Sequence, residues 1–524
     1  MDATKGTEGK YDVVIVGGAL SGAATAVLLL RQRPQLRILI IEKSAAFTRR
    51  VGEATIEIST YFLTHSLGLA QYLNETQLNK QGLRFWFANE RTKSLADCSE
   101  VGPRYMARLP SFLVDRAAMD EEVLRRACAL GAEVWRTATV QKVELVAGGN
   151  QKITVRHQER VMNLEARWVV DASGVAAVLA RQEGWWRANT AHPTTAVWSR
   201  WKGVKDFDGL ELATKFPAWA KHCYGMRGTA TNHLMGHGWW AWIIALKGGD
   251  VSVGVVFDQR TVTWPEGGTL AQRLKDFLMQ HPVGRELMAD AQWTDGDIHW
   301  RKNLPYYSTT FAGDGFSLVG DAAGFLDPYY SPGMDWISFS ATCTAELILA
   351  QQRGEPMTQR IERHNRDFAR SYERWFQAIY QDKYEYFGEY DLVKLSFLMD
   401  LGFYYMGLAN QPFKRGAVGL TEPYYSTKPS VPFFYFMRTY NRRFARIAQA
   451  RRERNCAGQT NDGQRFMFKG YNFAPSSAWP IAKAIAEWFW IELREGWRSW
   501  FRKPAGAVAS QNTVLAKVAM KPAP

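Results

Sequence analysis

The chain has 524 residues, a net charge of +14 and 46% hydrophobic residues, a composition that predicts two or three globular domains with large cores. No run reaches the roughly 18 apolar residues of a membrane-spanning helix, and residues 1–10 lack the apolar stretch of a secretory signal, so we expect a cytoplasmic protein with a disordered N-terminus over 1–10. The five cysteines form no CxxC pair, which argues against a disulfide framework and a metal site, while the basic balance favours an anionic partner such as a phosphate-bearing cofactor.

The first predicted unit is a strand, a small-residue turn and a helix. Residues 13–16 are apolar β-formers, and residues 23–30 form a helical run without glycine or proline. In the turn between them, Gly17 permits a sharp bend and Gly22 permits close packing of helix on strand, so the helix N-terminus faces a pyrophosphate. A second strand, 37–41, ends at Glu42, where this fold places an acid on the ribose hydroxyls. The predicted dinucleotide contacts are Gly17, Gly18, Ala19, Ser21, Gly22, Glu42 and Lys43, and a βαβ unit without a nucleotide is the alternative.

Further cofactor contacts are predicted along the following chain. Two arginines and an acid come just after the ribose-binding strand, and a helix begins near Arg116. An apolar strand ending in Asp-Ala-Ser-Gly at residues 171–174 returns the chain to the central sheet. A later strand ends at Asp321, whose carboxylate can accept a hydrogen bond from a polyol. The additional candidates are Arg50, Glu53, Ala54, Arg116, Val140 and Asp321.

The rest of the chain changes character twice. Residues 181–300 contain alternating strand-like runs, which predict an antiparallel sheet. From residue 351 the pattern is mainly helical, with aromatic and basic residues interleaved; this favours a helical cap with a solvated basic face over nucleic-acid binding. The Trp-rich stretch 478–500 has helical spacing, so it either packs on the protein or lies on a membrane surface.

Four stretches resemble the flavin-dependent halogenases, in the para-hydroxybenzoate-hydroxylase group of the glutathione-reductase-type FAD superfamily. Residues 240–244 are similar to the WxWxIP signature of these enzymes, although Ala245 replaces the proline. Residues 325–333 resemble the F…P…S…G motif that lies beside the flavin in these enzymes. Residues 79–82 resemble the stretch that carries their active-site lysine, and residues 52–55 resemble their GES segment near the flavin ring. Tyr330 stands where tryptophan halogenases carry a glutamate, which points toward the phenol or pyrrole branch.

The resemblance implies an α/β fold with a glutathione-reductase-type, Rossmann-like FAD-binding domain, an antiparallel substrate domain and a C-terminal helical region. The implied boundaries are 11–180 and 301–350 for the FAD-binding domain, 181–300 for the substrate domain and 351–524 for the helical region.

The resemblance also implies an activity. FADH2 from a separate flavin reductase would react with oxygen and a halide, chloride or bromide, to give hypohalous acid. Lys80 would direct the acid to a small aromatic substrate, either free or bound to a carrier protein, with Ser331 as a second catalytic residue. Because Pro332 has no N–H, Gly333 and Met334 would bind the halide as well as the cofactor. Trp86, Trp240 and Trp242 would line a tunnel from flavin to substrate.

Two other classes of function stay open. One is an FAD-dependent monooxygenase or dehydrogenase acting on an apolar substrate, and the other is a noncatalytic or membrane-surface flavoprotein suggested by the Trp-rich tail. The sequence leaves the substrate and the oligomeric state undetermined. It does predict that Gly17→Val removes the flavin while leaving most of the sheet intact.

Overall fold

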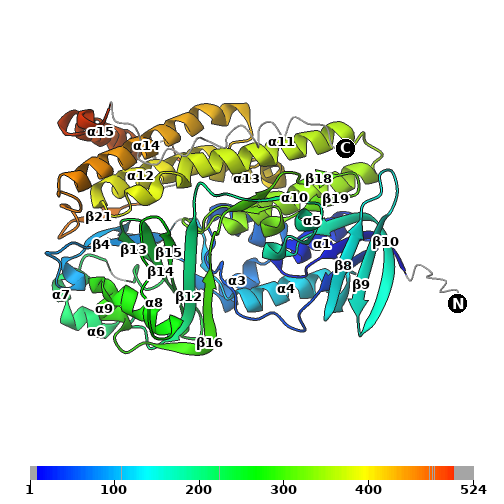
Figure 1. Cartoon of the computed structure of the whole chain (residues 1–524), viewed down its shortest axis with the longest axis horizontal. Coiled ribbons are helices and arrows are strands. Elements are labelled where there is room, and N and C mark those ends of the chain that lie inside the picture. The colour runs from blue at the N-terminus through cyan, green and yellow to red at the C-terminus, as the bar shows by residue number, and fades with distance from the viewer. Residues whose placement is uncertain are drawn as a thin grey trace.

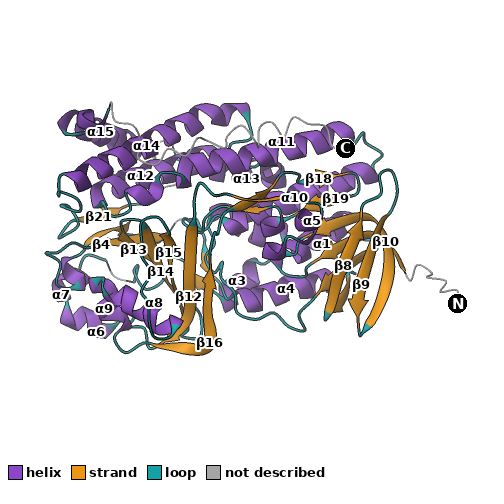
Figure 2. Cartoon of the chain, viewed as in Figure 1, coloured by secondary structure: helices purple, strands orange, loops and turns teal. Residues whose placement is uncertain are grey.

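The computed structural model describes residues 9–107, 109–223, 225–470, 473–474, 476 and 478–500. Within these residues, two sheets lie side by side and a layer of long helices extends across both of them (Figures 1 and 2). The fold is α/β, as predicted. Of the predicted disordered segment 1–10, residues 1–8 lie outside the described residues, and 9–10 begin the first strand.

The first sheet contains the predicted strand–turn–helix unit. Its strands β1, β2, β7, β10 and β19 pair in parallel, whereas β18, β9 and β8 join antiparallel. The parallel strands read as continuous apolar runs because helices cover the sheet. The order across the sheet is β18 (Ala312–Gly313), β19 (Phe316–Leu318), β10 (Arg160–Asp171), β1 (Gly9–Val16), β2 (Ile38–Glu42) and β7 (Glu133–Arg136), with the hairpin β8 (Ala138–Glu144) and β9 (Gln151–His157) beside β10.

Three helices build the wall of this domain around its nucleotide turn. The helix α1 (Leu20–Gln32) follows β1 directly and packs against both α4 (Arg116–Ala129) and α10 (Gly333–Gln352). Most of α1 is buried, with an alanine-rich surface that lets its neighbours approach closely. Shorter elements connect the parts of the chain: α2 (Glu57–Tyr61), α3 (Ala70–Thr76), α5 (Val178–Gln182), and the small strands β3 (Leu78–Asn79), β6 (Phe112–Leu113), β11 (Trp186–Ala188), β17 (Tyr306–Ser308) and β20 (Gly324–Phe325).

The second sheet extends beyond the predicted range 181–300, and it is mixed rather than purely antiparallel. Three of its strands come from outside that range, and the pairs β13–β4 and β5–β21 are parallel. Long-range pairing of this kind leaves no local pattern in the sequence. The order is β16 (Gln292–Arg301), β12 (Thr194–Lys202), β15 (Val251–Asp258), β14 (Trp239–Ala245), β13 (Thr231–Gly236), β4 (Leu83–Phe87), β5 (Ser99–Pro103) and β21 (Arg465–Phe468).

Each face of the second sheet is covered by helices. The short helices lie on one face, and a separate apolar cluster fills the space beneath them; they are α6 (Leu210–Lys215), α7 (Pro217–Ala220), α8 (Leu270–Met279) and α9 (Pro282–Met288). The opposite face carries α12 (Tyr390–Phe403), on which α14 (Val431–Glu453) and α15 (Ala478–Arg494) pack (Figure 1). The helical layer continues over the first domain through α11 (Thr358–Trp375), which contacts α10 and β18, and the short α13 (Asn410–Arg415) contacts α2. The helical region from residue 351 also contributes β21, and residues 501–524 lie outside the described residues.

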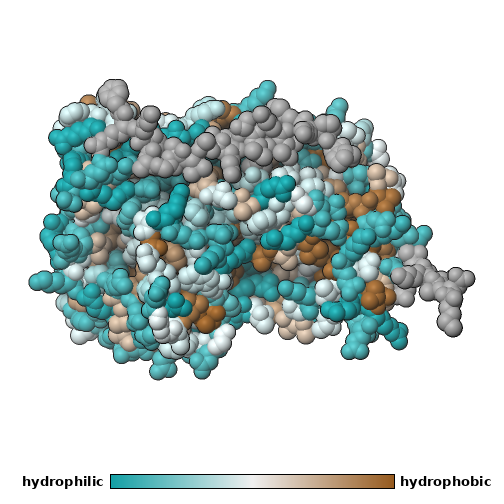
Figure 3. Space-filling view, viewed as in Figure 1, coloured by the Kyte–Doolittle hydropathy of each residue, from teal (hydrophilic) through white to brown (hydrophobic). Residues whose placement is uncertain are grey.

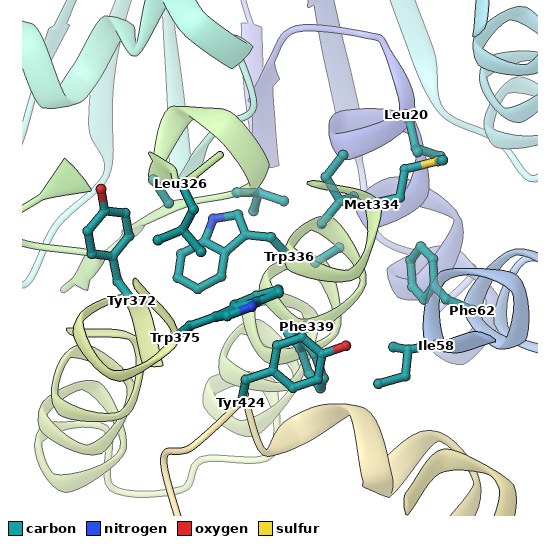
Figure 4. Packing of buried hydrophobic residues seen from close by; sticks show 14 of the residues in the cluster. Leu20, Ile58, Phe62, Leu326, Met334, Trp336, Phe339, Tyr372, Trp375 and Tyr424 are labelled. Carbon is teal, nitrogen blue, oxygen red and sulfur yellow. The ribbon is translucent and has the colours of Figure 1, made fainter. Parts of the chain in front are cut away.

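Aromatic side chains join the helical layer to the first domain. Trp336 and Phe339 of α10 lie against Trp375 and Tyr424 from the helical region (Figure 4), and the rings of Trp375 and Tyr424 meet edge to face with centroids 4.1 Å apart. Such contacts add to the apolar area that the packing removes from water. The helical layer is therefore part of one continuous core.

The surface in Figure 3 is largely hydrophilic, with scattered apolar patches. By length and composition, one described stretch, Tyr390–Thr421, could cross a membrane, and 61% of its apolar window is buried inside the protein. Buried core helices have this composition, so the stretch is explained by its packing under α14 and α15.

Candidate functional site

The nucleotide turn has the geometry that glycine was predicted to supply. Gly17 has φ +103°, and a Cβ there would lie 2.5 Å from the Ala172 carbonyl oxygen on the neighbouring strand. A Cβ on Gly22 would lie 1.9 Å from the Gly17 carbonyl oxygen. Ala19 caps α1 with extended backbone, so the first N–H groups of the helix are left without helical acceptors. Only glycine fits both positions, and the turn presents backbone donors to an anion.

Acidic and hydroxyl side chains surround this turn. Glu42 at the end of β2 accepts hydrogen bonds from Gly18 N (2.8 Å) and Ser44 N (2.9 Å), while Lys43 beside it is exposed. Ser21 in α1 lies against Gly320, where an added Cβ would be 2.5 Å from its Oγ. Burial raises the pKa of Asp321, and the nearby Arg301 and Arg116 oppose the rise. The structure therefore brings Glu42, Ser21 and Asp321 to the same edge of the sheet as the turn.

Arg116 is held in place rather than free. Its guanidinium pairs with Asp120 one helical turn later, with the Arg116 Nε to Asp120 Oδ1 distance at 3.0 Å, and lies against Gly52. Arg50 approaches the same Asp120, with 3.7 Å between Nη1 and Oδ2. Both arginines are thus anchored near the turn by one buried carboxylate.

Glu53 is paired with an arginine of the second sheet. Arg200 of the second sheet donates to the Glu53 carboxylate at 2.6 Å and to Asp115 at 2.8 Å. Glu53 therefore ties the first domain to the second sheet. Ala54 next to it bridges to Leu113, and Val140 lies at an irregularity in β8.

The start of α10 forms a second set of free backbone donors. Tyr330 (φ 69°) and Ser331 (φ 59°) adopt left-handed backbone just before it, which is costly for residues other than glycine and clusters at functional sites. Ser331 N donates to the Pro328 carbonyl oxygen at 2.9 Å. Pro332 caps the helix, which begins at Gly333, and a Cβ on Gly333 would meet nothing within 4 Å. Gly333 and Met334 thus supply the first N–H groups of α10, and there is open space beside Gly333.

A cavity of about 130 Å³ lies between this helix start and the helical layer. Its wall includes Lys80, Glu57, Tyr330, Pro332 and Asp400, and aromatic rings make up much of the rest: Tyr105, Trp375, Tyr380, Phe397, Tyr404, Tyr405, Tyr424, Tyr425 and Phe468. A cavity of about 150 Å³ holds benzene in a model protein. This cavity therefore has room for a single aromatic ring.

Lys80 lies in the wall of this cavity with its side chain 2% exposed. Its Nζ donates to the Thr55 carbonyl oxygen at 2.9 Å, and its backbone N donates to the Ser111 carbonyl oxygen at 2.7 Å. Burial lowers the pKa of Lys80 to about 8, against the opposing charges of Glu57 and Asp335. Desolvation penalises the ammonium form, so near neutral pH part of the population carries a nucleophilic amine.

This pKa gives a direct prediction. We expect modification of Lys80 by a small acylating reagent, followed by peptide mass spectrometry, to rise with a midpoint near pH 8. Because the folded-state pKa of Lys80 lies below 10.5, its ammonium opposes folding below about pH 8, and that penalty falls as pH rises from 8 toward 10.5. A midpoint for Lys80 near the ordinary lysine value of 10.5 would contradict its desolvation.

The predicted place of Trp86 in the tunnel lining is wrong. Both faces of β4 are buried, so alternation alone does not tell which face meets the cavity. Trp86 points into the cluster under the short helices, stacks on Phe207 and donates to Asn232 at 3.0 Å. Phe85 and Leu83 face the other side, and Leu83 lines the cavity.

Trp240 and Trp242 share one buried face of β14, on the side of the main core. Neither contributes to the wall of the described cavity. Trp240 donates to Tyr384 at 2.8 Å and packs on Tyr329, with ring centroids 5.4 Å apart. Trp242 donates to Ser252 at 3.1 Å. The ring of Tyr329 lies between Trp240 and Tyr330, with the Tyr329 and Tyr330 ring centroids 4.1 Å apart.

Three carboxylates near the cavity had no sequence signal. Glu57 begins α2 in the cavity wall, and Asp335 in the first turn of α10 accepts from Ser59 N at 2.9 Å and from Tyr424. Burial raises the pKa of Asp335 to about 7. Asp400 of α12 pairs with the buried Lys383. Glu57, Asp335 and Asp400 lie on elements that are far apart in the chain. The sequence shows that each is an acid, but not that they meet near one cavity. In the described residues no group of His, Cys, Asp and Glu has the arrangement of a metal site.

Comparisons with known proteins agree with this geometry. Residues 10–205 match the family described as FAD binding domain. The chain is 24% identical over 373 residues to the flavin-dependent halogenase chlA of Dictyostelium discoideum, a match that covers 64% of this chain and 60% of that relative. It is 25% identical over 398 residues to a 1H-pyrrole-2-carbonyl-[peptidyl-carrier protein] chlorinase of Pseudomonas fluorescens, covering 70% of this chain and 82% of that one.

The fold comparison adds a solved structure. The crystal structure of halogenase PltM in complex with phloroglucinol and FAD has a TM-score of 0.69 and 18% identity, covering 91% of this chain and 96% of that chain. The chain resembles the flavin-dependent halogenases in sequence and in fold. Its first sheet with α1 is an FAD-binding domain, and the predicted fold class is confirmed.

The residues of the nucleotide turn fit FAD. The missing side chains at Gly17 and Gly22 leave the backbone donors of α1 accessible, Glu42 ends β2, and the open space at Gly333 would admit a flat group beside α10. Gly17, Gly18, Ser21, Gly22, Glu42 and Asp321 would hold the cofactor. When bound and reduced, FAD supplies the activation of oxygen.

Proposed function

We propose that this protein is an FADH2-dependent halogenase that oxidises chloride or bromide with oxygen to hypohalous acid and halogenates an electron-rich ring. The observation that carries this proposal is Lys80, an amine desolvated in the wall of an aromatic cavity that Pro332, at the start of α10, also lines. The N–H groups of Gly333 and Met334 suit a halide, because a helix N-terminus favours an anion. Ser331 orders the turn before them.

The substrate proposal is a single phenol- or pyrrole-like ring. It is supported by the cavity volume of about 130 Å³ and by the names of two similar proteins, one structure with phloroglucinol and one chlorinase of a carrier-bound pyrrole. We further propose a cytoplasmic location, transient supply of FADH2 by a flavin reductase, and either free or carrier-bound delivery.

The test is incubation of the protein with FAD, a flavin reductase, NADH, bromide and a panel of phenols, pyrroles and indoles, read by isotope pattern in mass spectrometry. Halogenated phenol or pyrrole products are expected, and omission of bromide should remove them. Hydroxylated product without any halide requirement, or rapid NAD(P)H oxidation by the protein alone, would replace this proposal with the monooxygenase or dehydrogenase reading.

A peripheral membrane contact is a separate proposal, supported by α15. One face of α15 packs through Ile481, Trp488 and Ile491, while the opposite face and the turn after it expose Trp479, Phe489, Trp490, Leu493, Trp497 and Trp500. Aromatic residues beside basic ones suit an anionic membrane surface. We expect Trp490→Gln with Trp497→Gln to reduce co-sedimentation with anionic vesicles without lowering the melting temperature. Equal sedimentation of variant and wild type would contradict membrane contact through this face.

A further inference from the structure

Three carboxylates surround the aromatic cavity and its lysine, and they differ in how their oxygens are engaged. Asp400 accepts from Lys383 and Tyr330 on Oδ2 and from Tyr440 on Oδ1. Asp335 accepts from Ser59 N on Oδ1 and from Tyr424 on Oδ2. Glu57 accepts from Tyr405 on Oε1, and no donor among the described residues reaches its Oε2. Of these three carboxylates, only Glu57 has an oxygen that no donor among the described residues occupies, so a proton can reach it without displacing a hydrogen bond.

Glu57 is also fixed in the region where the lysine acts. It begins α2, whose next two N–H groups donate to Tyr404 Oη (3.2 Å) and to Asp335 Oδ1 (2.9 Å). Glu57 lines the same cavity as Lys80, and its charge is the larger of the two that stabilise the Lys80 ammonium. A ring carbon placed to react with an electrophile at Lys80 would thus lie in the part of the cavity that Glu57 faces.

Aromatic substitution requires a base at this place. A ring π pair forms the carbon–halogen bond, while the bond from halogen to hypohalous oxygen breaks and leaves its electron pair on that oxygen. The attacked carbon then carries both hydrogen and halogen. The ring becomes aromatic again only when the electron pair of the C–H bond returns to the ring and the proton leaves. In a cavity walled by aromatic rings, a fixed carboxylate is a better acceptor than scarce water.

We propose that Glu57 is the catalytic base that accepts the ring proton after halogen transfer. This proposal rests on the proposed halogenase function. It assigns separate tasks to two neighbouring groups: Lys80 positions the electrophile, and Glu57 completes the substitution. In this chain the position before Ser331 is Tyr330 rather than an acid. The carboxylate for this step therefore comes from α2.

The test is Glu57→Gln, which keeps an acceptor for Tyr405 and the shape of the side chain. We expect kcat for halogenation to fall about 10²-fold, with flavin content and trapped hypohalous acid unchanged. With a ring-deuterated phenol, the variant should show a primary isotope effect that wild type lacks, because proton loss becomes rate-limiting. Glu57→Asp should recover part of the rate, and Tyr405→Phe, which keeps the carboxylate, should show no isotope effect.

The possible results separate the assignments. A Glu57→Gln enzyme that halogenates at the wild-type rate, or that loses rate without an isotope effect, overturns the base assignment. In the second case, recovery at another pH would show that Glu57 only sets the protonation of Lys80. A wild-type enzyme that makes no halogenated product would instead reject the proposed function, and the two failures are therefore distinct.

Discussion

Lys80→Ala should abolish halogenated product while leaving FAD binding and FADH2 oxidation intact. The proposed flavin contacts are the turn at Gly17–Gly22 and the start of α10, whereas Lys80 lies in the cavity wall. Hypohalous acid should still form and leak into solution, where a thioether trap would detect it. Because the buried ammonium is penalised by desolvation, its removal should not lower the melting temperature.

Two further variants sharpen this experiment. Lys80→Arg should not restore product, because guanidinium stays charged and is a poor nucleophile. Lys275→Ala, at a half-buried lysine of α8 that bonds the Ala289 and Ala291 carbonyls and does not line the cavity, should behave as wild type. If Lys80→Ala halogenates normally, the role assigned to this lysine is wrong.

Gly17→Val should yield protein without flavin. The branched side chain would occupy the turn and meet the Ala172 carbonyl oxygen, which is 2.5 Å from the Cβ position. The structure changes the expectation that the sheet stays intact, because Ala172 directly follows β10, the strand paired with β1. A residue other than glycine at φ +103° costs roughly 1–3 kcal/mol by itself, so the folded sheet should also lose stability.

The measurements are the visible flavin spectrum after reconstitution and thermal unfolding of both proteins without FAD, since bound ligand alone would raise the wild-type melting temperature. Gly407→Ala is the matched control, because a Cβ there meets nothing within 4 Å. A Gly17→Val protein that binds FAD with wild-type affinity would show that the flavin is not held at this turn.

Local signals predicted the first domain well. The run of apolar β-formers, the glycines and the acid at the end of the second strand lie within about 30 residues, so their order alone indicated a βαβ nucleotide unit. The halide site at Gly333 and Met334 was indicated only by the resemblance of residues 325–333 to the halogenase motif. The sequence signal for Lys80 came only from the motif around it.

The parts that were mispredicted depend on tertiary contacts. Side chains alternate between the two faces of β4, as expected. Which face meets the cavity depends on the helices that cover each side, and the sequence pattern does not show this. Trp86 was therefore assigned to the wrong face. The parallel neighbours of β4 and β5 come from distant segments. Glu57 was not singled out because its function depends on Tyr405, Tyr404 and Asp335, which reach it only in the folded chain.

The pairing of β21 with β5 has a consequence for the order of events during synthesis. In the parallel pair of β21 and β5, Arg465 lies opposite Glu100. Farther along the chain, Phe468 and Gly470 form part of the cavity wall. Domains fold from the N-terminus as the chain emerges from the ribosome, so the nucleotide turn and Lys80 are made long before the segment that closes the wall around that lysine. The cofactor site, whose last proposed residues lie at the start of α10, should therefore be complete before β21 closes the cavity wall, and the desolvated amine should form last, when nearly the whole chain has left the ribosome.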